Sequence, residues 1–256
     1  MSSNHLTAAA LGPTGYRRGL ALQQALVDAR AAGETGDWVL FPDHPPVLTV
    51  GRSPSEGNLR VDRATLERQG IELFEVSRGG DITWHGPGQL VGYAIVDLTA
   101  RGRDLHRYLR ALEQTLIDAL GDWGIEGSRS PGRTGVWVGD EKIASIGVAV
   151  RRWVTYHGFA LNVEPDLAQF DLIHPCGLQG VRMTSIARRL GTAAPAFGTV
   201  RTRVAERLAA ALGHERLDWA DPAEVSRIEE RAGGVRPATL PFPQTFTRAA
   251  IQETGT

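Results

Sequence analysis

Residues 135–163 contain three apolar segments in close succession, and this run constrains the fold more than any other part of the sequence. The first two, 135–138 and 143–150, flank Gly139-Asp140-Glu141, a pattern that predicts a β-hairpin. The third covers residues 153–163 and follows after a short interruption. Such a run indicates a sheet in which neighbouring strands of the chain are mostly joined as hairpins.

Helical patterns separate the groups of strands. In the clearest of them, residues 104–120, leucine, isoleucine and tyrosine side chains recur on one face and Gly121 follows. Further helices are expected at 16–32, 62–69, 184–190 and 199–212, and further strands at 38–41, 47–50, 71–76 and 91–98. The sequence therefore predicts an α+β fold with a mixed, largely antiparallel sheet flanked by helices.

The two ends of the chain do not show this periodicity. We expect residues 1–12 to form a flexible N-terminal arm and residues 13–218 to form a single domain. Residues 219–256, rich in Pro, Gly, Arg and Thr, are expected to be a loosely ordered tail.

Bulk properties exclude several classes of protein. A formal net charge of −1 argues against a nucleic-acid partner, because such proteins usually carry a basic stripe. The sequence has no run of about eighteen apolar residues and no secretory pattern near its N-terminus, so we expect neither a membrane association nor export. With one cysteine, a disulfide framework is impossible, and the expected location is the cytoplasm.

A glycine-rich segment, residues 78–89, is the first candidate for a binding site. It reads RGGDITWHGPGQ, and its four glycines and one proline are expected to keep it out of regular secondary structure. Glycines let backbone N–H groups approach a ligand closely, although a tight connection between strands would use them equally well. The segment lacks the Gly-Lys-Ser/Thr ending of a phosphate-binding P-loop.

The chain contains one cysteine and one lysine, and both are candidates for chemistry. Cys176 lies between Pro175 and Gly177, in a turn that would present its thiol. Lys142 is the single lysine among 28 basic residues, the others being arginine, which indicates that its amine matters rather than its charge alone. A nearby ammonium would favour the reactive thiolate, and a neutral amine could take its proton.

Histidines offer alternatives to Lys142 as the base. His85, His157 and His174 are rival candidates, whereas His5, His44, His106 and His214 are expected on the surface. No histidine spacing matches a metal site such as H-E-x-x-H, so neither a metal nor another cofactor is expected.

Several of these motifs together resemble one family. The segment RGGDITWHGPGQLVGYAIVDL (78–98) is similar to the signature of lipoyl(octanoyl) transferases, also called octanoyl-[acyl carrier protein]:protein N-octanoyltransferases. The segments HPPVLTVGR (44–52), EKIASIGVAVRRWVTYHGFALNV (141–163) and PCGLQGVRMTSI (175–186) resemble the same family in the same order. The departures are small: Trp84 stands where many members carry Tyr or Phe, and Asp81 occupies a variable position.

The resemblance implies a fold similar to the catalytic domain of biotin and lipoate protein ligases. It implies transfer of octanoate from octanoyl-acyl carrier protein to a lysine of lipoyl domains in 2-oxoacid dehydrogenase E2 subunits or of the glycine cleavage H protein. By resemblance, Cys176 is the acyl-thioester nucleophile and Lys142 activates it. The substrate-binding positions that match the family are Arg78, Gly79, Gly80, Asp81, Ile82, Thr83, Trp84, His85, Ser145, Ile146, Gly147, Gly158, Phe159 and Ala160.

Two other functions fit the same residues. An ATP-dependent lipoate or biotin ligase also uses a glycine-rich loop and a lysine, but it has no need of a presented thiol. A non-catalytic module that binds lipoyl domains would leave that thiol unreactive. Transfer without ATP would separate the first alternative from a cysteine-dependent acyltransferase, and thiol reactivity would separate the second.

Overall fold

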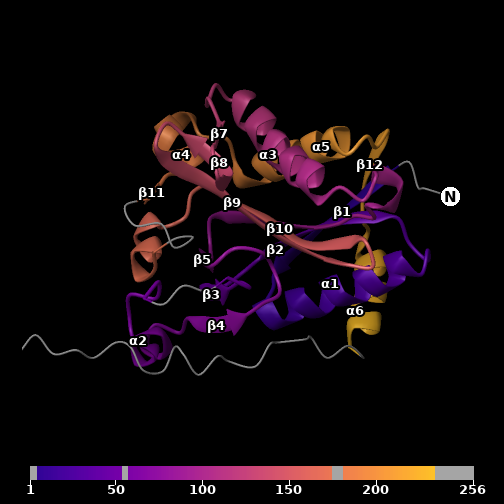
Figure 1. Cartoon of the computed structure of the whole chain (residues 1–256), viewed down its shortest axis with the longest axis horizontal. Coiled ribbons are helices and arrows are strands. Elements are labelled where there is room, and N and C mark those ends of the chain that lie inside the picture. The colour runs from indigo at the N-terminus through magenta and orange to yellow at the C-terminus, as the bar shows by residue number, and fades with distance from the viewer. Residues whose placement is uncertain (1–4, 54–56, 175–180, 234–256) are drawn as a thin grey trace, which may run out of the picture.

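The structure is a computed structural model that describes residues 5–53, 57–174 and 181–233. Within this part of the chain a nine-stranded sheet forms the centre of the molecule (Figure 1). Its strands follow the order β12 (Arg216–Trp219), β1 (His5–Pro13), β2 (Asp37–Asp43), β6 (Gln89–Ile95), β10 (Val154–Asn162), β9 (Glu141–Arg151), β8 (Arg133–Val138) and β7 (Ser128–Ser130), with β11 (Arg182–Met183) paired to β9. A three-stranded sheet of order β4 (Glu72–Glu75), β3 (Val47–Val50) and β5 (Ile82–His85) lies beside it.

The main sheet is mixed but largely antiparallel, as the sequence predicts. From β2 through β6, β10, β9 and β8 to β7 each pair is antiparallel, and β8 and β9 form the expected hairpin. Parallel pairs occur at the other edge, where β1 lies between β12 and β2, and where β11 joins β9. The α+β fold class is confirmed.

Helices cover both faces of the main sheet. In Figure 1, α3 (Leu105–Gly121) and α5 (Phe197–Ala211) lie on one face, with α1 (Tyr16–Ala31) and α6 (Pro222–Ala232) on the other. The short helices are α2 (Arg63–Arg68) and α4 (Ile186–Leu190), and 3₁₀ turns occupy Thr99–Arg101, Leu167–Leu172 and Gly191–Ala193. The five helices expected from apolar spacing are all present.

Helix α3 illustrates how the sequence specifies these elements. Asp104 caps its N-terminus by accepting a hydrogen bond from Arg107 N at 2.9 Å. Leu112, Leu116 and Leu120 then follow at a spacing of four residues and are buried against the sheet. Burying one leucine side chain is favourable by about 1.5–3 kcal/mol, so this face fixes the helix to the sheet.

Both ends of the chain differ from the expectation. The flexible arm is wrong for residues 5–12, because β1 pairs with strands on both sides and buries Leu6 and Ala8. The boundary at residue 218 falls inside β12, and α6 follows it with a capping box between Asp221 and Glu224. The tail is therefore regular up to residue 232, while residues 1–4 and 234–256 lie outside the described part.

The glycine-rich segment also contains more regular structure than expected. Residues 82–85 form β5, which pairs antiparallel with β3. The glycines of the segment precede and follow this strand. In the described part of the chain, no helix has the length and apolar character needed to cross a membrane.

Candidate functional site

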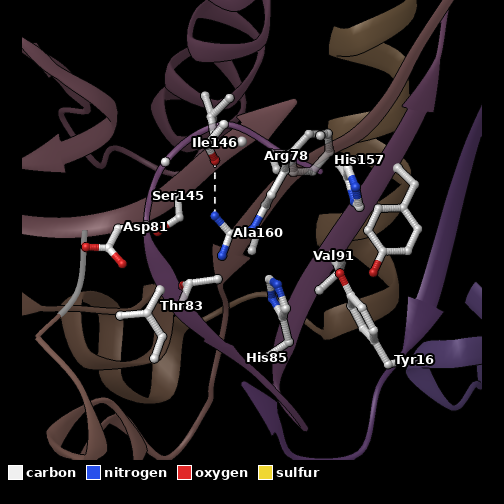
Figure 2. Close-up of a pocket in the computed structure, with 17 residues that line it drawn as sticks. Tyr16, Arg78, Asp81, Thr83, His85, Val91, Ser145, Ile146, His157 and Ala160 are labelled. Atoms are coloured by element: carbon white, nitrogen blue, oxygen red, sulfur yellow. Dashed lines mark hydrogen bonds between the residues drawn. The ribbon is translucent and has the colours of Figure 1, made fainter. Parts of the chain in front are cut away.

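A narrow cavity of about 50 Å³ lies where the glycine-rich segment meets the middle of the main sheet (Figure 2). Strands β9, β10 and β6 form one wall, the segment from Arg78 through β5 forms another, and the start of α1 contributes Tyr16. Apolar residues contribute part of its lining, namely Ile82, Val91, Ile146, Phe159 and Ala160. The cavity therefore suits an apolar ligand held among a few polar groups.

All the substrate-binding residues expected from the resemblance line this one cavity except Trp84. Three segments far apart in the sequence, residues 78–85, 145–147 and 158–160, therefore meet in space. The expectation is wrong for Trp84, because neighbouring residues of a strand face opposite sides and its ring is buried away from the cavity. The ring packs edge-on against Phe170, with 5.4 Å between the ring centroids. Its size therefore does not shape this cavity.

Four lining residues, Tyr16, Val91, Tyr93 and His157, were not among the expected binding residues. The sequence singled out His157 only as a rival base. Its backbone has a positive φ of 57°, which is unusual for a non-glycine residue. His157 N donates to Gln23 Oε1 at 2.7 Å, so α1 holds this irregular backbone in place.

Close backbone packing joins the glycine-rich segment to the sheet. Gly79 N donates to Val148 O at 2.9 Å, and a Cβ at Gly147 would lie only 2.9 Å from Gly79 O. A side chain at position 147 would therefore push the segment off β9 and open the cavity.

Arg78 is the cation of the cavity lining, and its position is closely defined. Its Nη2 donates to Thr49 O at 2.6 Å and to Thr49 Oγ1 at 2.9 Å. Its Nη1 donates to Gly79 O at 3.1 Å (Figure 2). The guanidinium is thus fixed between the small sheet and its own glycine turn, and it places positive charge beside the cavity.

The histidines around the cavity are held neutral. Burial lowers the pKa of His85 and that of His157 to about 3, and the charge of Arg78 acts in the same direction. His44 is buried as well, and burial lowers its pKa to about 4. Its expected surface position is therefore wrong, as is that of His214, whose buried side chain lies 3.3 Å from Asp37.

Lys142 lies in β9, three residues before the cavity residue Ser145. A β-bulge shifts the β8–β9 register, so that Val136 pairs with Ala144 and Trp137 with Lys142. Paired residues of neighbouring strands share a face, and the adjacent residues Val136 and Trp137 face opposite sides. Ala144 therefore faces the core with Val136, whereas Lys142 faces the other side with Trp137, as Ser145 does. The lysine therefore shares the cavity's face of the sheet.

The surroundings of Lys142 are tightly packed. The residue is 2% exposed, its Nζ lies 5.7 Å from the centre of the Trp137 ring, and Thr184 N donates to its carbonyl at 2.9 Å. Gly135 has a φ of 130°, and a Cβ there would lie 2.7 Å from Lys142 Cε. Only glycine at 135 leaves room for the lysine stem.

Cys176 lies outside the described residues, as do Pro175 and Gly177 to Gly180. The described residues on either side are His174, whose N donates to Asn58 O at 2.8 Å, and Val181, which precedes β11. His174, the third rival base, does not line the cavity. Among the described residues there is no group of three or more His, Cys, Asp or Glu placed to hold a metal ion.

Comparison with known proteins gives consistent results. Residues 15–209 match the family model of the lipoyl protein ligase A/B catalytic domain. The octanoyltransferase of Geobacter metallireducens is 48% identical over 214 residues, covering 84% of this chain and 96% of that protein. The octanoyltransferase of Geobacter sulfurreducens is also 48% identical, over 216 residues, covering 83% of this chain and 89% of that protein.

A solved structure of lipoate-protein ligase A bound with ATP has the same fold. Its TM-score is 0.72 at 17% identity, and the match covers 91% of this chain and 95% of that one. At such low identity this likeness concerns the fold alone.

Proposed function

We propose that this chain, an acyltransferase of the lipoyl protein ligase A/B catalytic-domain family, transfers an octanoyl group through a thioester on Cys176. Octanoyltransferases are similar to it over most of its length. The donor is octanoyl-acyl carrier protein. The acceptor is a lysine of a lipoyl domain, in a 2-oxoacid dehydrogenase E2 subunit or the glycine cleavage H protein. The reaction is the first step of endogenous lipoate biosynthesis, and its expected location is the cytoplasm.

One observation carries this proposal: the cavity and Lys142 occur together on one face of β9. Val91 and Ala160, which lie opposite each other in β6 and β10, supply apolar surface for an acyl chain. Each methylene that such a chain buries is favourable by about 0.8 kcal/mol, an upper limit for a flexible chain. Chain-length preference should therefore be graded, with about a fourfold change in affinity per carbon.

The proposed chemistry proceeds in two steps. The thiolate of Cys176 attacks the thioester carbonyl of the donor, the carbon–sulfur bond to the carrier breaks, and the carrier thiol leaves with a proton. The neutral amine of the acceptor lysine then attacks the new thioester, an amide forms, and the thiol of Cys176 is regenerated. Lys142 is proposed to activate the thiol, either by taking its proton or by favouring the thiolate.

This route needs no ATP. Exchange between two thioesters is nearly balanced in free energy, and conversion of a thioester to an amide is downhill. The competing function, an adenylating ligase on the same fold, would require free acid and ATP. Octanoyl transfer from carrier protein to a lipoyl domain with ATP absent is therefore the expected result, and transfer only with octanoate plus ATP would establish the ligase instead.

A further inference from the structure

A chain of buried hydrogen bonds connects a backbone carbonyl to the cavity. Asn162 Nδ2 donates to Thr184 O at 3.0 Å, and Gln89 Nε2 donates to Asn162 Oδ1 at 2.9 Å. The chain ends at His85, whose Nδ1 lies 2.7 Å from Gln89 Oε1. Gln89 and Asn162 are opposite each other in β6 and β10, and both are buried.

The direction of every bond in this chain follows from its first member. A backbone carbonyl can only accept, so Asn162 must present its NH₂ to Thr184 and its oxygen to Gln89. Gln89 must then present its NH₂ to Asn162 and its oxygen to His85. Because that oxygen can only accept, the proton of the neutral imidazole belongs on Nδ1, and Nε2 of His85 is a bare acceptor.

The bare nitrogen is available to the cavity. His85 lines the cavity and its ring extends into it (Figure 2). Within the described part of the chain, Nε2 of His85 forms no hydrogen bond. His44 gives the contrast: its Nδ1 is bonded to Thr14 O at 2.7 Å, which likewise leaves Nε2 as an acceptor, but the Tyr93 hydroxyl occupies that position at 2.7 Å.

We propose that Gln89 and Asn162 are positioning residues that hold His85 with its proton on Nδ1, so that Nε2 accepts a hydrogen bond from an N–H group of the substrate. The identity of that group rests on the proposed function. Its two sources there are an amide of the carrier's pantetheine arm and the amine of the acceptor lysine. Burial and Arg78 keep the imidazole neutral at physiological pH, so Nε2 stays an acceptor throughout the reaction.

The first test reads the tautomer directly. The full chain, labelled with ¹⁵N-histidine, is studied by long-range ¹H–¹⁵N correlation at pH 7, with His85 assigned by its loss in His85→Ala. The expected wild-type spectrum has a protonated Nδ1 and an unprotonated Nε2, and Asn162→Ala should lose this preference because Gln89 can then rotate. A wild-type His85 with its proton on Nε2 would overturn the proposal, whether or not any variant folds.

The second test measures the two half-reactions separately, donor to enzyme and acyl-enzyme to lysine. Asn162→Ala should slow one of them about tenfold, the usual effect of one lost hydrogen bond to substrate. A loss in the first half-reaction identifies the pantetheine amide as the donor of that bond, and a loss in the second identifies the lysine amine. Thr115→Val, which removes a buried hydroxyl bonded to Ala111 O in α3, is the matched control and should keep the wild-type rates.

A double-mutant cycle separates positioning from structural damage. If Asn162 acts through His85, adding Asn162→Ala to His85→Ala should have no further effect on that half-reaction. A full tenfold loss in both backgrounds would refute the positioning role. If wild-type protein transfers no octanoyl group, the proposed function fails, whereas the tautomer measurement still tests the hydrogen-bond chain.

Discussion

Replacing Lys142 with arginine tests whether the amine itself is required. The side chain is 2% exposed, and a Cβ at Gly135 would lie 2.7 Å from its Cε, so little space remains around the stem. A guanidinium is larger and planar, and its pKa above about 12 prevents it from accepting a proton. Lys142→Met keeps the length of the stem and removes the charge.

The two variants should differ in stability but not in activity. Overpacking by arginine should lower the free energy of unfolding by about 1–3 kcal/mol, and Lys142→Met should change it by less than about 1.5 kcal/mol. Loss of general acid–base assistance should slow acyl transfer to Cys176 by about 10²- to 10⁴-fold in both, equivalent to about 3–5 kcal/mol of barrier.

The assay is single-turnover acylation followed across pH, with urea unfolding to show that each variant is folded. An arginine variant that keeps more than about a tenth of the wild-type rate would refute the requirement for an amine. Lys142 would then act as a fixed positive charge near the thiol.

Three further predictions follow from the cavity and the helices. Because burial lowers the pKa of His157 from 6.5 to about 3, the unfolded chain takes up the extra proton between these values, and stability falls as pH drops through that window. Between pH 6 and 4 the free energy of unfolding should therefore fall more steeply in wild type than in His157→Phe, by about 1.4 kcal/mol per pH unit. Urea melts that give the two proteins the same pH dependence of this free energy would contradict a buried neutral histidine. Ala160→Val narrows the cavity and should shift preference from octanoyl to hexanoyl donors by about four- to tenfold in competition assays, whereas an unchanged ratio would remove Ala160 from the acyl site. Ile228→Ala should lower the free energy of unfolding by about 2–4 kcal/mol, measured by thermal or urea unfolding, because α6 packs on α1. A loss no larger than that of Val225→Ala, at a half-buried position, would show that residues 222–232 form a loose tail.

The elements that the sequence predicted are those whose pattern is local. Helix α3 carries its own cap at Asp104 and a leucine on every turn of one face, and the β8–β9 hairpin has its turn at Gly139. Strand β1 was missed because Thr7-Ala8-Ala9-Ala10 is poor in β-branched and aromatic residues. Parallel partners on both sides specify it, and they come from residues 37–43 and 216–219, far away in the sequence.

The same distinction applies to the site. Motif resemblance placed Arg78, Ser145 and Gly158 among the binding residues, and they do line one cavity. No local pattern pointed to Tyr16 on α1 or Tyr93 on β6, whose rings reach the cavity only because the sheet and helix pack together. The resemblance carried over every position from Arg78 to His85, Trp84 included, whereas the alternation of β5 turns the Trp84 side chain away from the cavity.

Helix α6 could have been predicted. Asp221-Pro222 followed by Glu224 is the pattern of a capped helix start with proline at the first position, and the structure forms both capping bonds. The Gly and Arg residues around this helix start interrupt the apolar periodicity, and for that reason we predict a tail there from the sequence.

The central claim is a covalent octanoyl intermediate on Cys176, and intact-protein mass spectrometry tests it most directly. Wild-type protein mixed with octanoyl-acyl carrier protein, without acceptor or ATP, should gain one octanoyl group that hydroxylamine removes and that peptide mapping places on Cys176. Cys176→Ala should gain none and should not transfer octanoate to a lipoyl domain. Transfer by Cys176→Ala at the wild-type rate, or acylation elsewhere in the chain, would contradict the account.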